Sequence, residues 1–202
     1  YRVEAREASG LTITNGPHLF MYSQSHLPKL LAEGAVWHYW TWNAAPPTNW
    51  MRPEFSDNAW AAGSAPLGYN DYGSERFATT LSYGPERTNK LAAYYFRAGF
   101  VVTNLPALGT LKLWVRLDDG VVLYLNGAEV ARTNLSSGWV GYTTWSTGGS
   151  ENPPRPWVGF SVPVACLVEG TNLLAAEVHQ AGAGSSDLFF DLLAQPESLN
   201  TT

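Results

Sequence analysis

Residues 110–132, TLKLWVRLDDGVVLYLNGAEVAR, alternate apolar and polar side chains and then reach two turn signals. The apolar set is Leu111, Leu113, Val115 and Leu117, and the set between them is Lys112, Trp114 and Arg116. A period of two is typical of a strand that buries one face. Asp118, Asp119 and Gly120 then interrupt the strand. The pair Asn126-Gly127 favours the positive φ angles of a tight hairpin, so residues 121–125 and 129–132 are predicted to pair.

Further stretches rich in aromatic and β-branched residues stand between loops of Gly, Pro, Ser and Asn. They predict a first strand near Trp37 and strands at residues 94–102, 158–164, 172–179 and 188–193. No βα alternation interrupts them. The pattern therefore predicts an all-β fold, an antiparallel β-sandwich or jelly roll.

The first 35 residues differ in residue pattern from the rest of the 202-residue chain. They contain one stretch expected to be a short helix, PKLLAEG at residues 28–34, with Ser25 as its cap and Gly34 at its end. We therefore expect an N-terminal extension at residues 1–35, a sandwich domain at residues 36–195 and a C-terminal tail at residues 196–202.

Composition excludes several classes of partner. Charged residues make up 14% of the chain and the net charge is −5, so there is no basic face for nucleic acid. No apolar run approaches the roughly 20 residues that span a bilayer. The single Cys166 lies in the apolar stretch 160–168, where a small buried thiol is expected. A Trp-rich, Lys-poor, sheet-like composition favours a secreted or cell-surface bacterial protein.

The motifs of common catalytic sites are absent from the sequence. There is no G-x-S-x-G nucleophile turn, no glycine-rich phosphate loop and no H-E-x-x-H zinc helix. The four histidines lack the spacing of metal ligands. We therefore expect no catalytic activity, while a lyase or glycosidase that uses Tyr, His or paired carboxylates on a β-sandwich stays open as an alternative.

Carboxylates at three places in the sequence are candidates to bind calcium, to bind sugar hydroxyls or to form internal ion pairs. Asp118 and Asp119 could bind a structural Ca²⁺ through their oxygens, or could bond nearby backbone amides as turn residues do. Asp71, in LGYNDYGSE at residues 67–75, could serve the same ion, bind sugar hydroxyls or belong to a solvated loop. Asp191 stands among apolar strand residues and is expected to pair with a cation, for which Arg97 is a candidate.

Aromatic residues make up 13% of the chain and include nine Trp. Residues 138–157, GWVGYTTWSTGGSENPPRPW, place several rings in a predicted loop. Pyranose rings stack their C–H faces on such side chains while polar neighbours bind the hydroxyls. The alternative is that the rings pack beneath a long loop. The candidate ligand-binding residues are Asp71, Tyr72, Trp139, Trp145, Trp157, His179, Gln180 and Asp187.

Four segments in one order carry a family resemblance. They are FSDNAWAAGSAPLGYND at residues 55–71, SYGPERTNKLAAYYFRAGFVV at 82–102, LDDGVVLYLNGAEVARTNL at 117–135 and VEGTNLLAAEVHQAGAGSSDLFFDLLA at 168–194. From about Trp37 onward the chain resembles the galactose-binding-like jelly-roll domains of large secreted bacterial proteins. The DDGVVLYLNG piece also looks like the sugar-binding sandwich domains attached to glycoside hydrolases. Residues 37–50, WHYWTWNAAPPTNW, carry more aromatics than that family usually shows, which would create a ligand platform or pack the extension.

The resemblance implies an accessory domain, because such domains accompany several kinds of enzyme and many have no assigned ligand. Our leading hypothesis is a non-catalytic carbohydrate-binding module that targets a linked enzyme or exported protein to a polysaccharide or oligosaccharide. The alternative is a spacer that holds neighbouring domains of a larger chain and has no glycan ligand.

Overall fold

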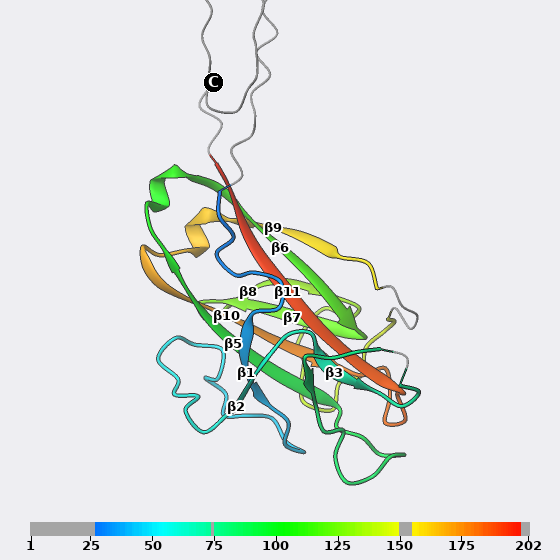
Figure 1. Ribbon diagram of the computed structural model, residues 1–202. Helices are drawn as coiled ribbons and strands as arrows, with labels where there is room; N and C mark the ends of the chain where they lie inside the picture. The colour runs from blue at the N-terminus through cyan, green and yellow to red at the C-terminus, as the bar shows by residue number, and fades with distance from the viewer. Residues whose placement is uncertain (1–26, 74, 150–154, 199–202) are drawn as a thin grey trace, which may run out of the picture.

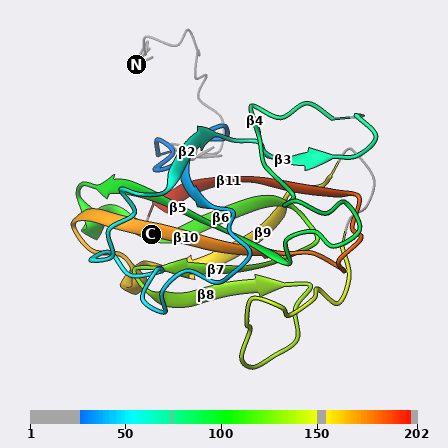
Figure 2. The ribbon, with the colours of Figure 1, turned by 90° about the horizontal axis from the view of Figure 1, so that it is seen from below.

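A computed structural model describes residues 27–73, 75–149 and 155–198. Two β-sheets face each other across one apolar core (Figures 1 and 2). The six-stranded sheet has the order β2 (Ala61–Ser64), β1 (Val36–Trp40), β5 (Ala93–Val102), β10 (Gly170–His179), β7 (Gly120–Leu125) and β8 (Ala128–Thr133). The five-stranded sheet has the order β4 (Thr79–Thr80), β3 (Leu67–Asn70), β11 (Asp187–Ser198), β6 (Leu108–Asp118) and β9 (Val158–Pro163).

All strand pairs are antiparallel except the short pair β3 and β4. The only helical segments in the described ranges are two short 3₁₀ turns, η1 (Leu105–Ala107) and η2 (Val164–Cys166). No described helix is long and apolar enough to cross a membrane. The predicted all-β sandwich is confirmed.

Strand β6 has the alternation that the sequence predicts. Its four apolar side chains point between the sheets and are at most 5% exposed, while Trp114 on the other face is 40% exposed. The chain then changes sheets, because β6 ends at Asp118 in one sheet and β7 begins at Gly120 in the other. The hairpin β7–β8 turns at Asn126 (φ 51°) and Gly127 (φ 88°), as expected for this pair.

The core between the sheets contains large rings at its centre. Phe190 of β11 stacks on Phe96 of β5 at a ring-centroid distance of 4.3 Å and meets the edge of Trp37 of β1 at 4.9 Å. These three side chains are fully buried. Phe and Trp bury the largest apolar area per residue, so contacts between opposite sheets of this kind contribute much of the stability.

The expected helix at residues 28–34 is wrong. Leu31 instead forms an isolated antiparallel bridge with Ala194, in which each backbone N–H donates to the carbonyl of the other residue. The leucines of this stretch pack against the sandwich core, and pairing with β11 satisfies the backbone that a helix would have satisfied internally. Gly34 does end the stretch with a positive φ of 77°. The proposed cap, Ser25, lies outside the described residues.

Two expectations about single residues are corrected. Cys166 is only partly buried, at the end of η2. Asp191 does not pair with Arg97, because the two side chains lie on the outer faces of opposite sheets. Asp191 accepts the backbone N–H of Gly34 at 3.2 Å, and burial raises the pKa of its carboxyl. Arg97 pairs with Asp57 at 2.8 Å.

Candidate functional site

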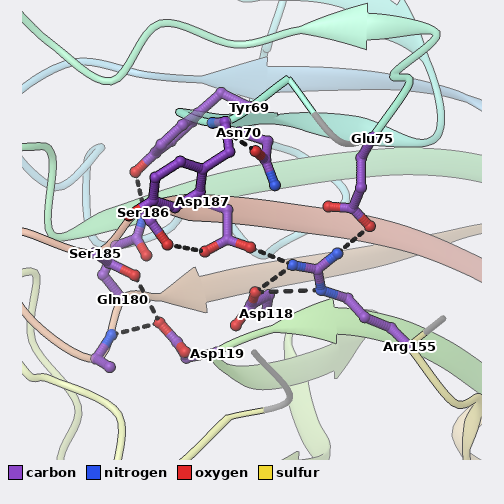
Figure 3. A network of polar contacts seen from close by, with 12 residues as sticks. Tyr69, Asn70, Glu75, Asp118, Asp119, Arg155, Gln180, Ser185, Ser186 and Asp187 are labelled. Carbon is purple, nitrogen blue, oxygen red and sulfur yellow. Dashed lines mark hydrogen bonds and ion pairs between the residues drawn. The ribbon is translucent and has the colours of Figure 1, made fainter. Parts of the chain in front are cut away.

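A buried polar network occupies one end of the sandwich (Figure 3). Its centre is Arg155, only 2% exposed, which precedes β9. The Nη2 of Arg155 lies 2.6 Å from Oδ2 of Asp118, at the end of β6. The same guanidinium pairs with Asp187, the first residue of β11, and with Glu75, in the loop between β3 and β4. One arginine thus joins three elements that are far apart in the sequence.

Three carboxylates around one guanidinium give the network an excess of negative charge. Burial, and then the neighbouring Asp119, raise the pKa of Asp118 to about 9 despite the ion pair with Arg155. Asp118 therefore holds a proton at neutral pH. The remaining charges of Glu75 and Asp187 are shared by Arg155, as buried carboxylates require.

A second part of the network ties the loop between β10 and β11 to its neighbours. Asp119 accepts the backbone N–H of Ala181 at 2.6 Å. Gln180 donates to the hydroxyl of Tyr69 at 2.5 Å. Lys90, 3% exposed, donates to Asp71 at 2.7 Å and to the carbonyl of Ser185 at 2.6 Å. These contacts connect the loops at this end of the sandwich, and those of Asp119 and Lys90 are charge-assisted.

The structure brings together five of the residues selected from the sequence, but their partners belong to the protein itself. They are Asp71, Asp118, Asp119, Gln180 and Asp187. Within the described part of the chain, no group of three or more His, Cys, Asp or Glu side chains is arranged to hold a metal ion. The calcium site at Asp118 and Asp119 stays a prediction.

A cleft of about 340 Å³ lies elsewhere, on the outer face of the six-stranded sheet. Its floor comes from three strands, with Tyr95 on β5, Tyr124 on β7 and Glu177 on β10. One wall is the segment of residues 45–51, and the other is the loop of residues 138–142 after β8. The aromatic rings that line it are Trp50, Tyr95, Tyr124, Trp139 and Tyr142, and its charged residues are Glu129, Arg132 and Glu177.

The aromatic segment of residues 41–60 forms its wall by packing across the sheet (Figure 2). Trp50 meets the rings of Tyr95 and Tyr124 edge-on at 5.0 and 5.6 Å. It forms a second apolar cluster there with Trp60 and Ala175. The aromatic excess noted in the sequence thus covers the sheet and builds one side of the cleft.

Arg97 holds this segment in place from below. It projects from the outer face of β5 and is 4% exposed. Its guanidinium donates to the carbonyls of Trp50, Arg52 and Phe55 and to the carboxylate of Asp57. A planar group with five donors can satisfy several carbonyls at once, which a lysine cannot do.

The polar groups of the cleft are held by internal hydrogen bonds. Glu177 accepts the hydroxyl proton of Tyr124 at 2.6 Å, and its other oxygen lies 3.5 Å from Nε2 of His179. Burial, and then the charge of Glu177, raise the pKa of both Tyr95 and Tyr124 above the usual range. These two floor hydroxyls therefore stay protonated.

The 138–142 loop combines a fixed ring with an exposed one. Tyr142 donates to Asn43 at 2.9 Å and accepts the N–H of Ala92 at 3.2 Å, so its position is set from two sides. Trp139 is 87% exposed. A Cβ on Gly141 would stand 2.1 Å from the Trp139 ring, so a glycine is required for this ring to lie where it does. Trp139 is thus an exposed ring at the edge of the cleft.

The remaining aromatic candidates do not share this cleft. Tyr72 is 79% exposed in the loop after β3, and Trp145 is 39% exposed in the loop after β8. Trp157 lies beside Arg116, on the outer face of the five-stranded sheet. His179 is fully buried and its Nδ1 faces the carbonyl of Thr144 at 2.7 Å. Of the eight candidate ligand residues, Trp139 alone lines the cleft.

Sequence reasoning missed the floor of the cleft. Tyr95 and Glu177 are directly opposite each other in the pairing of β5 with β10. The adjacent pair Tyr94-Tyr95 was a usable signal, because strand neighbours point to opposite faces. Large rings on both faces of one strand indicate that something covers the outer face, and residues 41–60 supply that cover.

No protein-family model matches the sequence, and no curated protein is similar to it. Solved structures do share its fold. A β-glucuronidase of an uncultured Clostridium species aligns with 89% of this chain and 31% of its own, at a TM-score of 0.52 and 15% identity. Bacteroides uniformis β-glucuronidase 2, covalently bound to cyclophellitol-6-carboxylate aziridine, aligns with 79% of this chain and 17% of its own, at a TM-score of 0.51 and 14% identity. Ruminococcus gnavus β-glucuronidase aligns with 89% of this chain and 30% of its own, at a TM-score of 0.50 and 8% identity.

At these identities the likeness concerns the fold alone. The chain spans less than a third of each of these three proteins. The match therefore shows that this chain has the fold of one part of these β-glucuronidases.

Proposed function

We propose that this chain is a non-catalytic carbohydrate-binding module of the galactose-binding-like type, and that its sugar site is the aromatic cleft on the six-stranded sheet. The observation that carries the proposal is the combination of five aromatic side chains with Glu129, Arg132 and Glu177 in one cleft. Structural similarity to part of several β-glucuronidases supports a carbohydrate-related context. We further propose that the module acts outside a bacterial cell, attached to an enzyme or to other domains.

The cleft has the chemistry that sugar binding needs. The faces of aromatic rings attract the C–H groups of a pyranose, and carboxylate and guanidinium groups bind its hydroxyls. A volume of about 340 Å³ falls within the range of small-molecule sites. Trp139 is exposed enough to stack on a ligand from the open side.

Affinity electrophoresis through gels that contain soluble polysaccharides tests the proposal. The domain and two variants, Trp139→Ala and Trp42→Ala, are run on one panel. Trp42 is also exposed, at 68%, but it stacks on Trp40 and does not line the cleft. We expect at least one polysaccharide to retard the wild type and Trp42→Ala, and Trp139→Ala to bind about tenfold more weakly.

Two outcomes would contradict the proposal. Unchanged mobility across a broad panel would favour the spacer-domain alternative. Equal retardation of all three proteins would place the sugar site away from the cleft. Thermal melting of the variants provides the control, because removal of an exposed ring should leave the melting temperature unchanged.

A further inference from the structure

The balance of charge in the aromatic cleft points to a particular class of sugar. Arg132 is the cation among the cleft's lining residues, and four of its five N–H donors are already used. It binds both carboxylate oxygens of Glu129, at 2.6 and 2.7 Å. It also donates to the carbonyls of Ser136 and Gly138, at 2.5 and 3.1 Å. The Glu129–Arg132 pair is therefore neutral as a unit.

The Glu129–Arg132 pair leaves the negative charge of Glu177 without a partner of opposite charge in the described part of the cleft. Its side chain is 6% exposed, one of its oxygens accepts the hydroxyl proton of Tyr124 at 2.6 Å, and the other lies 3.5 Å from Nε2 of His179. Among the residues that the structure describes, no Lys or Arg forms an ion pair with it. A carboxylate at the bottom of an aromatic cleft favours a positively charged ligand, because burial reduces screening by water.

His179 lies beside Glu177 and is fully buried. Its Nδ1 faces the Thr144 carbonyl at 2.7 Å and must carry a proton to bond with it. Its Nε2 lies 3.5 Å from the Glu177 carboxylate. This Nε2 is buried and has no hydrogen-bond partner. The contact between Nε2 and Glu177 is longer than an ordinary hydrogen bond, so the Glu177 carboxylate can still accept an N–H donor from a ligand.

The aromatic walls favour the same kind of ligand. Ammonium groups are attracted to the faces of Trp and Tyr rings, most strongly where water is excluded. Trp50, Tyr95 and Tyr124 surround the position of Glu177 on the sheet. A uronic acid would bring a second unbalanced carboxylate beside Glu177, which like-charge repulsion opposes.

We propose that the cleft selects glycans with protonated amino sugars, of the glucosamine type with an unmodified amine, over neutral sugars and uronic acids. This inference rests on the proposed carbohydrate-binding function. The ammonium group is directed to Glu177 at the floor, and the sugar ring stacks on Trp139 at the opening.

Isothermal titration with three β-1,4-linked tetramers tests the selectivity, since they differ only at carbon 2. The probes are the glucosamine tetramer, the N-acetylglucosamine tetramer and cellotetraose. We expect the free amine to bind about tenfold more tightly than the other two. Added NaCl should weaken its binding and leave that of cellotetraose unchanged.

The Glu177→Gln variant should bind the glucosamine tetramer no more tightly than the other two, while it still binds neutral sugars. The control is Glu86→Gln, since Glu86 is exposed and lies outside the cleft, and this variant should keep the preference for the free amine. Circular dichroism establishes that both variants are folded. The NaCl dependence of binding is measured on the wild type, so that part of the test does not depend on the folding of a variant. Equal affinity for the three tetramers, or tighter binding of a polyuronate or of another neutral glycan, would overturn the selectivity but leave the binding module standing. Failure to bind any glycan of a broad panel would overturn both proposals.

Discussion

At the scale of single residues, the end of the sandwich depends on Arg155. Its guanidinium contacts three carboxyl groups, those of Asp118 at the end of β6, Asp187 at the start of β11 and Glu75 in the loop between β3 and β4. Replacing Arg155 with Met keeps the apolar stem and leaves these carboxyl groups without their guanidinium partner. We expect a loss of about 3–5 kcal/mol in the free energy of unfolding, measured by urea denaturation.

The matched control is Arg76→Met, since Arg76 is exposed and lies next to Glu75 in the sequence. Its unfolding free energy should change by less than about 0.5 kcal/mol. If both variants lost the same stability, the network would contribute nothing beyond an ordinary surface arginine.

The raised pKa of Asp118 has a consequence for pH dependence. With its pKa at about 9 in the folded state, the native protein holds a proton that the unfolded chain has released above about pH 4. Stability from this group is therefore fully present in acid and is lost as pH rises toward 9, at up to about 1.4 kcal/mol per pH unit.

Asp118→Asn removes this titration. Urea unfolding of both proteins at intervals from pH 6 to pH 9 should show the variant gaining stability relative to the wild type as pH rises. The exposed Glu86→Gln should run parallel to the wild type. Parallel profiles for Asp118→Asn as well would mean that this carboxyl is already ionised at pH 6.

At the scale of elements, Arg97 hydrogen-bonds the backbone of the segment of residues 41–60, which forms a wall of the cleft. Lysine has one compact ammonium and cannot reach three carbonyls and the Asp57 carboxylate together. We expect Arg97→Lys to increase hydrogen exchange in residues 41–60 and to weaken sugar binding, while β5 and β10 stay protected.

Arg52→Lys is the control, because Arg52 is exposed and its nearest ion-pair contact, with Glu54, is 3.9 Å long. It should leave both exchange and binding unchanged. A segment that stayed protected in Arg97→Lys would show that Trp50 and Trp60 anchor it by packing alone.

The strands and the hairpin could be predicted from the sequence because their signals are local. The alternation of apolar and polar residues over Leu111–Leu117 and the turn at Asn126-Gly127 are each contained in a few consecutive residues. The stretch at residues 28–34 has helix signals too, but pairing of Leu31 with Ala194 overrides them. That contact joins positions more than 160 residues apart, so no window of sequence contains it.

The candidate site was less predictable, for a related reason. Turn and loop signals selected Asp71, Asp118 and Asp187 separately, but they did not indicate Arg155, which contacts Asp118 and Asp187. The cleft depends on register between strands: Tyr95 lies opposite Glu177, and Tyr124 bonds to it. Only Trp139 carried a local signal, as an aromatic residue among loop residues.

At the scale of the whole molecule, the two outer faces of the sandwich differ. The six-stranded sheet carries the cleft, while Trp114 and Trp157 lie on the five-stranded sheet, where Trp157 packs beside Arg116. We expect Trp157→Ala to leave glycan affinity unchanged in the electrophoresis assay. A loss equal to that of Trp139→Ala would move the binding surface to the other sheet.

The most direct test of sugar binding in the cleft is titration of a ¹⁵N-labelled domain with a retarding glycan, followed through the indole N–H signals of its nine Trp. Single Trp→Phe variants assign the signals. We expect saturable shifts for Trp139 and Trp50, which line the cleft, and none for Trp37 in the core or Trp157 on the opposite sheet. Shifts confined to Trp114 and Trp157, or no shift at saturating glycan, would contradict the assignment.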